Sequence, residues 1–310
     1  MENQALLKQM EVISKNQNIV LPADDSRAFL SDLVSRANTL PKLDTYYAKS
    51  DVGQIDALNI APRQLKLHQG LATEPDFTDK VSHRSVEFIV RNLYLDTWLE
   101  RDDIYYTALS RGQDIDQAIA QMLQQRFAAD IQDLAFNGDE ASTNNFIKMN
   151  DGFLKLAKTA AAVVENGETA RVIEGDVTMA KLAELVASVP ADQIALGEYK
   201  FILGRAAHLK LQAEVANRQT FVGDNALVQG RLESAHGFMF EVVDHITTDE
   251  VIFTPLNNLV TVLGRQVNLA RETTGATATI KQSILYFLLS GVDFIIRTPR
   301  AVAYLGPVTP

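Results

Sequence analysis

The chain has 310 residues, of which 46% are hydrophobic and 22% are charged, and its formal net charge is −10. It is long enough to bury the core of one large domain or two smaller ones. The acidic balance argues against nucleic acid or an anionic membrane as a tight partner, because phosphate binding needs clustered Lys and Arg. The absence of cysteine excludes disulfides, thiolate nucleophiles and Cys-ligated zinc.

No segment has the pattern of a signal peptide or of a membrane span. The N-terminus, MENQALLKQMEVISK, lacks a basic stretch followed by a long apolar one. The most apolar tract, SILYFLLSGVDFII, is interrupted by Ser290, Gly291 and Asp293, and its Val, Ile and Phe content favours buried strands. We therefore expect cytoplasmic synthesis and neither export nor membrane insertion.

Residues 1–50 are predicted to form an N-terminal arm with two short helices. Each helix would have one weak apolar face, and Pro41 would end the second helix. Short helices of this kind are marginal in isolation, so we expect both to dock on the rest of the chain. The two faces are formed by Leu6, Leu7, Met10 and Ile13, and by Phe29, Leu30, Leu33 and Val34.

Residues 51–92 are predicted to form a long β-hairpin with a charged, mobile tip. Val86, Phe88 and Val90 alternate with polar residues, which is the period of a half-buried strand. The segment ALNIAPRQLKLHQ shows a similar alternation, with Pro62 placing that strand at an edge or a bulge. The segment GLATEPDFTDK between them is rich in turn-forming and charged residues.

Residues 115–136 are predicted to form one long amphipathic helix. It follows LYLDTWLERDDIYYTAL, which we interpret as a second helical stretch or a connector, with Trp98 in the core. Asn137 and Gly138 are expected to end the helix in a left-handed conformation. The apolar stripe comprises Ile115, Ile119, Met122, Phe127, Ile131 and Leu134.

The second half of the chain mixes helices and strands, which predicts an α+β fold. From Val177 a helix, TMAKLAELVASV, precedes a strand, YKFILG, and another helix, RAAHLKLQAEVAN. Strands then dominate to the C-terminus. They are FMFEVVDHI, EVIFTPL, LVTVLG, ILYFLL, VDFIIRTP and AVAYLG.

No pattern in the sequence predicts a catalytic, cofactor or metal site. There is no phosphate-binding loop, dinucleotide fingerprint, HExxH or GxSxG motif. The paired carboxylates are expected in solvated turns, and His208 near Lys210 and Glu214 fits a hydrated helix face at least as well as a proton relay. The five histidines are scattered at positions 68, 83, 208, 236 and 245, and the paired carboxylates are Asp102 and Asp103, Asp139 and Glu140, and Asp249 and Glu250.

The order of these segments resembles that of tailed-bacteriophage major capsid proteins, which have the Hong Kong 97-type fold. The resemblance covers the chain from about Pro41, and it is most similar to the branch of P2-like temperate myophages. This family is united by shape more than by a catalytic site. The most specific pieces are VRNLYLDTWLERDD before the long helix, Asn137-Gly138 followed by Asp151-Gly152, and the closing RTPRAVAYL.

The resemblance implies a structural subunit with no enzymatic activity and no cofactor. Such a subunit would self-assemble into pentamers and hexamers of an icosahedral head around double-stranded DNA, built in the host cytoplasm. The implied segments are an N-terminal arm (1–50), an extended hairpin loop (51–92), a peripheral domain (93–176) with a spine helix (115–136), an axial domain (177–252) and closing strands that return to the peripheral domain (253–310).

The implied partners are copies of the same chain, a scaffolding protein, a portal, and packaged DNA held only by weak non-specific contact. An acidic lining would let packaged DNA slide. As a hypothesis, charged hairpin residues pair across subunit interfaces, where surface ion pairs matter through repetition. These residues are Glu74, Asp76, Asp79, Lys80 and Arg84.

Two features of the family do not carry over directly. Some members have a long N-terminal scaffolding segment that a protease removes, whereas only about fifty residues precede this hairpin, so that segment is already gone or scaffolding is a separate protein. Some members crosslink a hairpin Lys, and we expect no crosslink through Lys66 or Lys80. Two alternatives remain: an encapsulin-like compartment shell, and an α+β enzyme or small-ligand binder, whose expected pocket signature the sequence lacks.

Overall fold

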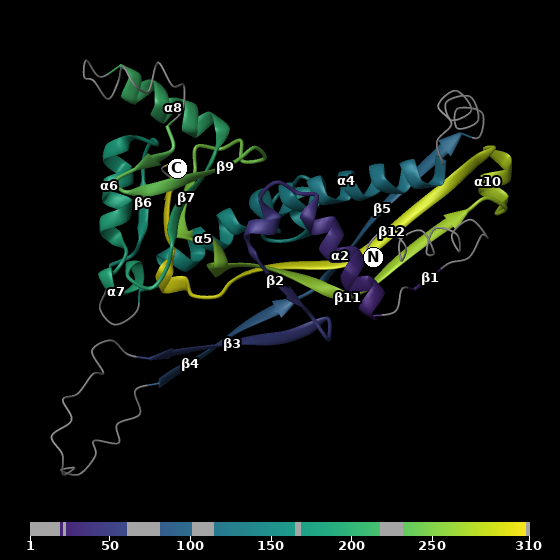
Figure 1. Cartoon of the computed structure of the whole chain (residues 1–310), viewed down its shortest axis with the longest axis horizontal. Helices are drawn as coiled ribbons and strands as arrows, with labels where there is room; N and C mark the ends of the chain where they lie inside the picture. The colour runs from purple at the N-terminus through teal and green to yellow at the C-terminus, as the bar shows by residue number, and fades with distance from the viewer. Residues whose placement is uncertain are drawn as a thin grey trace, which may run out of the picture.

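The computed structural model describes residues 19–20, 23–60, 81–100, 115–164, 169–217 and 232–307. In this part of the chain the strands form three sheets, with helices packed on the two larger ones (Figure 1). The helices are α2 (Ala23–Ser35), α4 (Ile115–Asn137), α5 (Phe153–Ala162), α6 (Met179–Ser188), α7 (Ala191–Ile194), α8 (Arg205–Ala216) and α10 (Ala276–Ile280), with short 3-10 helices η1 (Leu40–Lys42), η2 (Ile147–Met149), η3 (Leu256–Asn258) and η4 (Pro299–Ala301).

The first sheet is built on two long antiparallel strands, β11 (Leu259–Glu272) and β12 (Ser283–Ile296), which α10 connects. Its order is β1-β11-β12-β5, with β1 at Ile19–Val20 and β5 at Arg91–Glu100, and β2 (Asp44–Tyr47) pairs parallel with β11. The register of β11 on β12 shifts between Leu263 and Val267. Such a bulge bends the strand pair and increases its twist.

The second sheet has six strands in the order β6-β13-β10-β7-β9-β8. One face of this sheet packs with buried residues of α6 and α8, such as Leu182 and Leu211. The other face, which includes Ile202 and Ile252, lies in the same core as the first sheet. Aromatic rings fill the centre, and Phe201 and Phe253 lie 4.8 Å apart between centroids. The strands are β6 (Val172–Glu174), β7 (Tyr199–Gly204), β8 (Ser234–Ala235), β9 (Phe238–Val243), β10 (Val251–Pro255) and β13 (Ala303–Gly306).

The predicted closing strands divide between the two large sheets. The tracts ILYFLL and VDFII form a single strand, β12, in the first sheet, and LVTVLG is the start of the longer β11. In contrast, β10 pairs with β7, and the last strand, β13, pairs with β10 and β6. Residues 253–310 therefore do not return as one group to the first sheet, because the chain crosses back to the second sheet after β12.

The long helix is confirmed, but one residue of its expected apolar stripe is exposed instead of buried. α4 extends from Ile115 to Asn137 and lies alongside the long strands of the first sheet (Figure 1). Phe127, Ile131 and Leu134 are buried against α2, α5 and that sheet, whereas Met122 is 67% exposed. Met122 shares a helix face with Gln125 and Arg126, which are also exposed, whereas Gln124 on the other side of the helix is 3% exposed. The structure describes the backbone of Ile115 and Ile119 but not their side chains.

The arm docks on the body, as expected for its second helix. Leu30 and Leu33 of α2 are fully buried in the same core as α4, and Leu40 of η1 follows them. The first expected stripe, within residues 6–13, lies outside the described residues. The docked helix therefore contributes to the core of the first sheet instead of standing free.

The stretch from Arg91 to Glu100 is a strand, which corrects the expectation of a helix or connector. β5 pairs with β12 along its whole length, from Arg91 opposite Val292 to Glu100 opposite Ser283. Trp98 is half-buried on this strand, outside the core, and the Lys281 ammonium lies 5.1 Å from its ring centroid. The neighbouring strand decides the conformation here, which overrides a weak local preference.

The antiparallel hairpin is confirmed, but its first strand begins at Val52, before the predicted segment that starts at Ala57, and the part of that segment after Ile60 lies outside the described residues. β3 (Val52–Ile60) pairs antiparallel with β4 (Val81–Ile89), with Val52 opposite Ile89. The pair forms a separate two-stranded sheet that extends away from the two larger sheets (Figure 1). Pro62 and the expected mobile tip fall in residues 61–80, outside the described residues.

Candidate functional site

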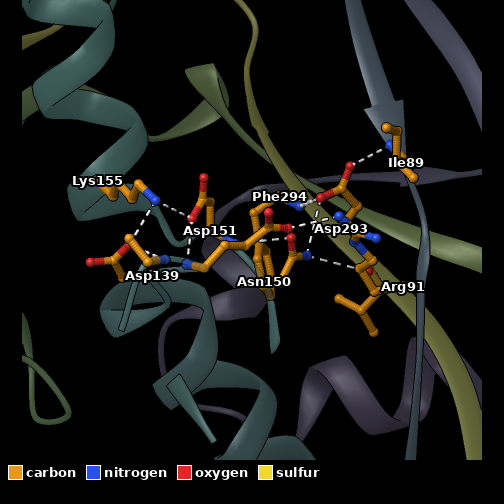
Figure 2. A network of polar contacts seen from close by, with 11 residues as sticks. Ile89, Arg91, Asp139, Asn150, Asp151, Lys155, Asp293 and Phe294 are labelled. Carbon is orange, nitrogen blue, oxygen red and sulfur yellow. Dashed lines mark hydrogen bonds and ion pairs between the residues drawn. The ribbon is translucent and has the colours of Figure 1, made fainter. Parts of the chain in front are cut away.

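A buried carboxylate anchors the hairpin where it leaves the body. Asp293 of β12 is 8% exposed, and its Oδ2 accepts a hydrogen bond of 2.8 Å from the backbone N–H of Ile89, the last residue of β4. Its Oδ1 accepts bonds from the Phe294 N–H at 2.8 Å and from Asn150 Nδ2 at 3.1 Å. Figure 2 shows these bonds converging from three segments. We call Ile89, Arg91, Asn150 and Asp293 the hairpin junction.

Burial dominates the electrostatics of this carboxylate. Desolvation raises the pKa of Asp293 above its ordinary value, and the bonds from Ile89 and Asn150 and the charge of Arg91 oppose that rise only in part. An ionised carboxylate in such a place is costly, and it is tolerated because three donors meet it. These bonds hold the end of β4 in place against β12. Among the described neighbours of Asp293 there is no second carboxyl or histidine that could exchange a proton with it.

A second polar cluster continues from the junction to the end of α4. Arg91 pairs with Glu140 at 2.8 Å, and the Glu140 backbone N–H donates to Asp151 Oδ1 at 2.7 Å. Lys155 Nζ bridges Asp139 at 2.6 Å and Asp151 at 2.7 Å (Figure 2). Bonding to Lys155 lowers the pKa of the Asp139 carboxyl, and bonding to Asp139 and Asp151 raises the pKa of Lys155.

These contacts change the interpretation of the Asp139-Glu140 pair. It was expected to be a plain exposed turn, and both residues do lie at the surface, but each pairs with a cation from another segment. No local pattern could have shown this, because Lys155 and Arg91 are 16 and 49 residues away along the chain. The cluster links the turn after α4 to both the hairpin and α5.

Two glycines bring the ends of α4 and α5 into backbone contact. A Cβ on Gly138 would lie 2.6 Å from the Leu134 carbonyl oxygen, and one on Gly152 would lie 2.6 Å from the Gly138 nitrogen. The Gly152 N–H donates to the Gly138 carbonyl at 2.9 Å. The expected left-handed exit is wrong, since Gly138 does not have a positive φ. Glycine is required here for close approach.

The hairpin base has one buried face and one exposed face. Phe88 is 3% exposed, its ring lies 5.7 Å from that of Tyr46, and it packs with Val260 and Val262 of β11. On the opposite face, Val52 and Ile89 form a cross-strand pair that is 64% and 51% exposed. An exposed apolar pair of this kind on a projecting element is available to another molecule.

A groove of 790 Å³ lies beside the polar cluster, between the ends of α4 and α5 and the segment 244–250. Asp133, Lys155, His245 and Glu250 contribute to its lining. Within the described ranges, no three His, Asp or Glu residues lie close enough to hold a metal ion. None of the described helices is both long and apolar enough to cross a membrane.

The other chemical candidates from the sequence find separate partners. His208 Nε2 bonds the Leu232 carbonyl at 2.7 Å, Lys210 pairs with Asp249, and Glu214 accepts the Met179 backbone N–H at 2.9 Å. The His208 segment therefore fits the hydrated-face interpretation. Asp102 and Asp103 lie outside the described residues.

Most of the hairpin charges expected at subunit interfaces lie outside the described part of the chain. Glu74, Asp76, Asp79 and Lys80 fall outside the described residues. Arg84 lies in β4, with its backbone opposite Ala57, and its side chain is not among those described. Their interface role stays a prediction, whereas the hairpin junction is a site that the sequence did not indicate.

No protein-family model matches the chain. A chain in the procapsid of satellite phage P4, a particle that includes the size determination protein, is 14% identical and superposes with a TM-score of 0.68 over 100% of this chain and 98% of that chain. The chain has the Hong Kong 97-type capsid fold.

Other proteins with this fold match over slightly less of the chain. A capsid chain of a native GTA particle is 14% identical, with a TM-score of 0.58 over 88% of this chain and 91% of that chain. A virus-like particle from Pyrococcus furiosus has a TM-score of 0.50 and 12% identity, over 90% of this chain and 97% of that chain.

One curated relative is similar in sequence. YqbE of Bacillus subtilis (strain 168), provisionally named a prophage capsid protein, is 28% identical over 189 residues. The match covers 60% of this chain and 57% of the relative, so the chain spans less than two thirds of that protein's length.

Proposed function

We propose that this chain is the major capsid protein of a tailed bacteriophage, a structural subunit with no enzymatic activity. The observation that carries the proposal is the whole-length match of its fold to a procapsid chain, at a TM-score of 0.68. The sequence similarity to a provisionally named prophage capsid protein supports it independently. Closed shells arise when one chain repeats the same contacts with symmetric closure, and a projecting hairpin suits such contacts.

We propose a role for each segment, and the arrangement of the sheets supports it. Residues 1–50 would be the arm, residues 51–92 the loop that overlaps a neighbouring subunit, and the first sheet with α4 the peripheral domain. The second sheet would be the axial domain around the five-fold and six-fold centres of pentamers and hexamers, and it would include β13, because β13 pairs with β10 and β6.

The proposed partners are further copies of the chain, a scaffolding protein and a portal, with double-stranded DNA enclosed and bound only weakly. The net charge of −10 supports weak binding, since tight phosphate binding needs clustered cations. The proposed location is the virion head, assembled in the host cytoplasm. The branch of P2-like temperate myophages is proposed on the sequence pieces given above.

The hairpin charges are proposed to pair across subunits. Reversing Glu74 and Asp76 to Lys should impair assembly, because like charges would then meet where opposite charges pair in every copy. The measurement is the fraction of protein that sediments as shells, compared with a control that reverses Asp249, which pairs with Lys210 of the same chain on α8. Normal yields of shells from the Glu74 and Asp76 variant would remove these residues from the interface.

A compartment shell that encloses enzymes is the second candidate. The match to the virus-like particle from Pyrococcus furiosus favours it, although that TM-score of 0.50 is lower than the 0.68 found for the procapsid chain. The genes beside this one distinguish the two. Terminase and portal genes would support the phage head, and a gene for a cargo enzyme would support the compartment.

Size-exclusion chromatography of the full chain tests the structural role against an enzyme or ligand-binding role. Expressed with and without a scaffolding protein, a shell subunit should elute as large assemblies or as rings that convert into them. A discrete monomer or dimer under every condition would contradict the proposal.

A further inference from the structure

The Asn137-Gly138 pair at the end of α4 is a chemically reactive sequence. Asparagine is among the labile residues of proteins, and a glycine after it leaves the next backbone nitrogen unhindered by a Cβ. The chain has two such pairs, and the other, Asn166-Gly167, lies outside the described residues. The contacts of Asn137 and Gly138 therefore decide whether this pair can react in the folded chain.

The reaction is an exchange of one amide bond for another. The Gly138 backbone nitrogen attacks Cγ of Asn137, and the new N–Cγ bond closes a succinimide ring. The Cγ–Nδ2 bond breaks, and the side-chain nitrogen leaves as ammonia with the proton that the Gly138 nitrogen gives up. Water then opens the ring at either carbonyl, which leaves aspartate, or isoaspartate with the main chain passing through the former side chain.

In the folded chain the attacking nitrogen is held away from its target. The Gly138 N–H donates to the Leu134 carbonyl at 2.9 Å. Gly138 is buried, and a Cβ there would collide with the Asn150 carbonyl oxygen and lie 2.9 Å from the Gly152 nitrogen. A peptide packed this closely has no room to turn. The packing that requires glycine at 138 therefore also immobilises the nitrogen that would attack.

The side chain of Asn137 is held in the opposite direction. Helix side chains point toward the N-terminus of their helix, and Asn137 Nδ2 donates to Oδ1 of Asp133, one turn earlier, at 2.6 Å. The same nitrogen donates to the carbonyl of His245 at 2.7 Å. Both N–H groups of the amide are thus in use, and the side chain must leave both acceptors before its Cγ can meet the nitrogen of Gly138.

The product would not fit the place that Asn137 occupies. Deamidation replaces the NH2 group by a carboxylate oxygen, which can only accept hydrogen bonds. This oxygen would face the Asp133 carboxylate and the His245 carbonyl, so like charges would meet and no donor would remain between them. The groove beside Asn137 already has more carboxylates than ammonium groups in its lining, namely Asp133, Asp139, Asp244 and Glu250 against Lys155 and Lys158.

We propose that Asn137 is a deamidation site that the folded chain protects and the opened chain exposes. The reaction occurs only after the end of α4 has separated from α5 and from the segment 244–250, and its product prevents these contacts from forming again. Water is the only co-reactant, and a reversible opening becomes an irreversible one. The site is internal to one chain and does not rest on the proposed function.

The rate of deamidation in the folded and the unfolded full chain tests the protection. Samples with and without denaturant are kept in mildly alkaline buffer, and mass spectrometry of peptides follows residues 137 and 166. In denaturant, Asn166 serves as the control, because only the local sequence then matters and both Asn-Gly pairs should react. Without denaturant, Asn137 should react at least about tenfold more slowly than in denaturant, since opening must come first. Equal rates at Asn137 in the two samples would overturn the proposal.

Direct replacement tests the effect of the product. Asn137→Asp introduces the carboxylate without ageing, and Asn137→Ser is the matched control, because serine has a similar helix propensity, no charge and a hydroxyl that can still donate. The Asp variant should unfold at a lower denaturant concentration than the Ser variant, or fail to fold where the Ser variant folds. A midpoint for Asp equal to or above that for Ser would contradict the proposed effect of the product.

A measurement on the wild type covers the case in which neither variant folds. The full chain is aged in denaturant until part of it has deamidated at residue 137, and the denaturant is then removed. The deamidated form should be at least about fivefold less abundant in the folded fraction than in the fraction that fails to fold. Equal abundance in the two fractions would show that the product does fit, and would overturn the proposal.

Discussion

At the scale of single residues, Asp293 combines two opposed requirements. Its carboxylate is the acceptor for the last amide of the hairpin and for Asn150, yet burial raises its pKa. A carboxyl whose pKa is higher in the folded than in the unfolded chain adds stability below the unfolded pKa and loses it as the pH rises through the folded pKa. The anchor of the hairpin is therefore held at a cost that grows toward neutral pH.

The variant Asp293→Asn isolates this contribution. The free energy of unfolding of the wild type minus that of the variant should be greatest near about pH 4 and should decrease toward about pH 7, since only the wild type has the titrating carboxyl. Chemical denaturation at several pH values measures the difference. A difference that increases with pH would show that the three hydrogen bonds and Arg91 outweigh burial.

Gly138 is a second residue with a sharp steric requirement. Its Cβ would meet the carbonyl oxygens of Leu134 and Asn150, and backbone atoms cannot move aside cheaply. We predict that Gly138→Ala lowers the free energy of unfolding by about 2 to 3 kcal/mol. Gly237→Ala is the control, because its Cβ would meet nothing within 4 Å and only the backbone conformation, at φ 87°, is strained.

The control should lose only about 1 kcal/mol, the cost of a left-handed conformation for alanine. A loss at Gly138 no greater than that of the control would show that the close contacts at 138 cost no more than a left-handed alanine does at 237. A neutral Gly138→Ala would mean that the contact between the ends of α4 and α5 can relax.

At the scale of elements, the buried face of the hairpin holds it against the first sheet, and its other face is exposed to solvent. Phe88→Ala should lower the free energy of unfolding by about 3 to 4 kcal/mol, because its ring is buried against Tyr46 and β11. Ile89→Ala, one residue further on and 51% exposed, should change stability by less than about 0.5 kcal/mol. Denaturation of the two variants side by side gives the comparison.

If the proposed function holds, Ile89→Ser together with Val52→Ser should leave the subunit folded but reduce the yield of shells. The reverse order, with a stable Phe88→Ala and an unfolded Ile89→Ala, would contradict the assignment of the two faces.

Helices and strands whose own apolar residues recur at a clear helical or strand spacing could be predicted from the sequence. The helix at 115–137 was expected to within one residue, and the pairing of β3 with β4 was expected from the alternation around Phe88. β5 could not be predicted, because its conformation follows from ten residues of β12 that lie almost two hundred positions later. The same holds for Trp98, whose exposure depends on β5 being a strand.

The hairpin junction also lay beyond the sequence pattern. Asp293 was noted only as an interruption in an apolar tract, and its partners Ile89 and Asn150 are 204 and 143 residues away. A charged residue inside an otherwise apolar strand was the one available signal, since such residues are rarely buried without partners. The identity of the partners depends on the folded arrangement.

At the scale of the whole molecule, the chain consists of two large sheets that share one core, a second core on the opposite face of the second sheet, and a projecting hairpin. Polar contacts also link these parts: the junction at Asp293, the bonds of Gln132 to Thr39 and His245, and the ion pair between Lys42 and Glu241. Charged and polar links of this kind fix orientation more than they add stability. The order of segments predicted the fold class, whereas the assignment of β13 to the second sheet required the structure.

Electron microscopy of the expressed full chain, with and without a scaffolding protein, tests the central claim most directly. Closed shells of uniform size, built from rings of five and six copies, are the predicted result. Particles no larger than a monomer or dimer under all conditions, with the hairpin folded against its own subunit, would contradict it.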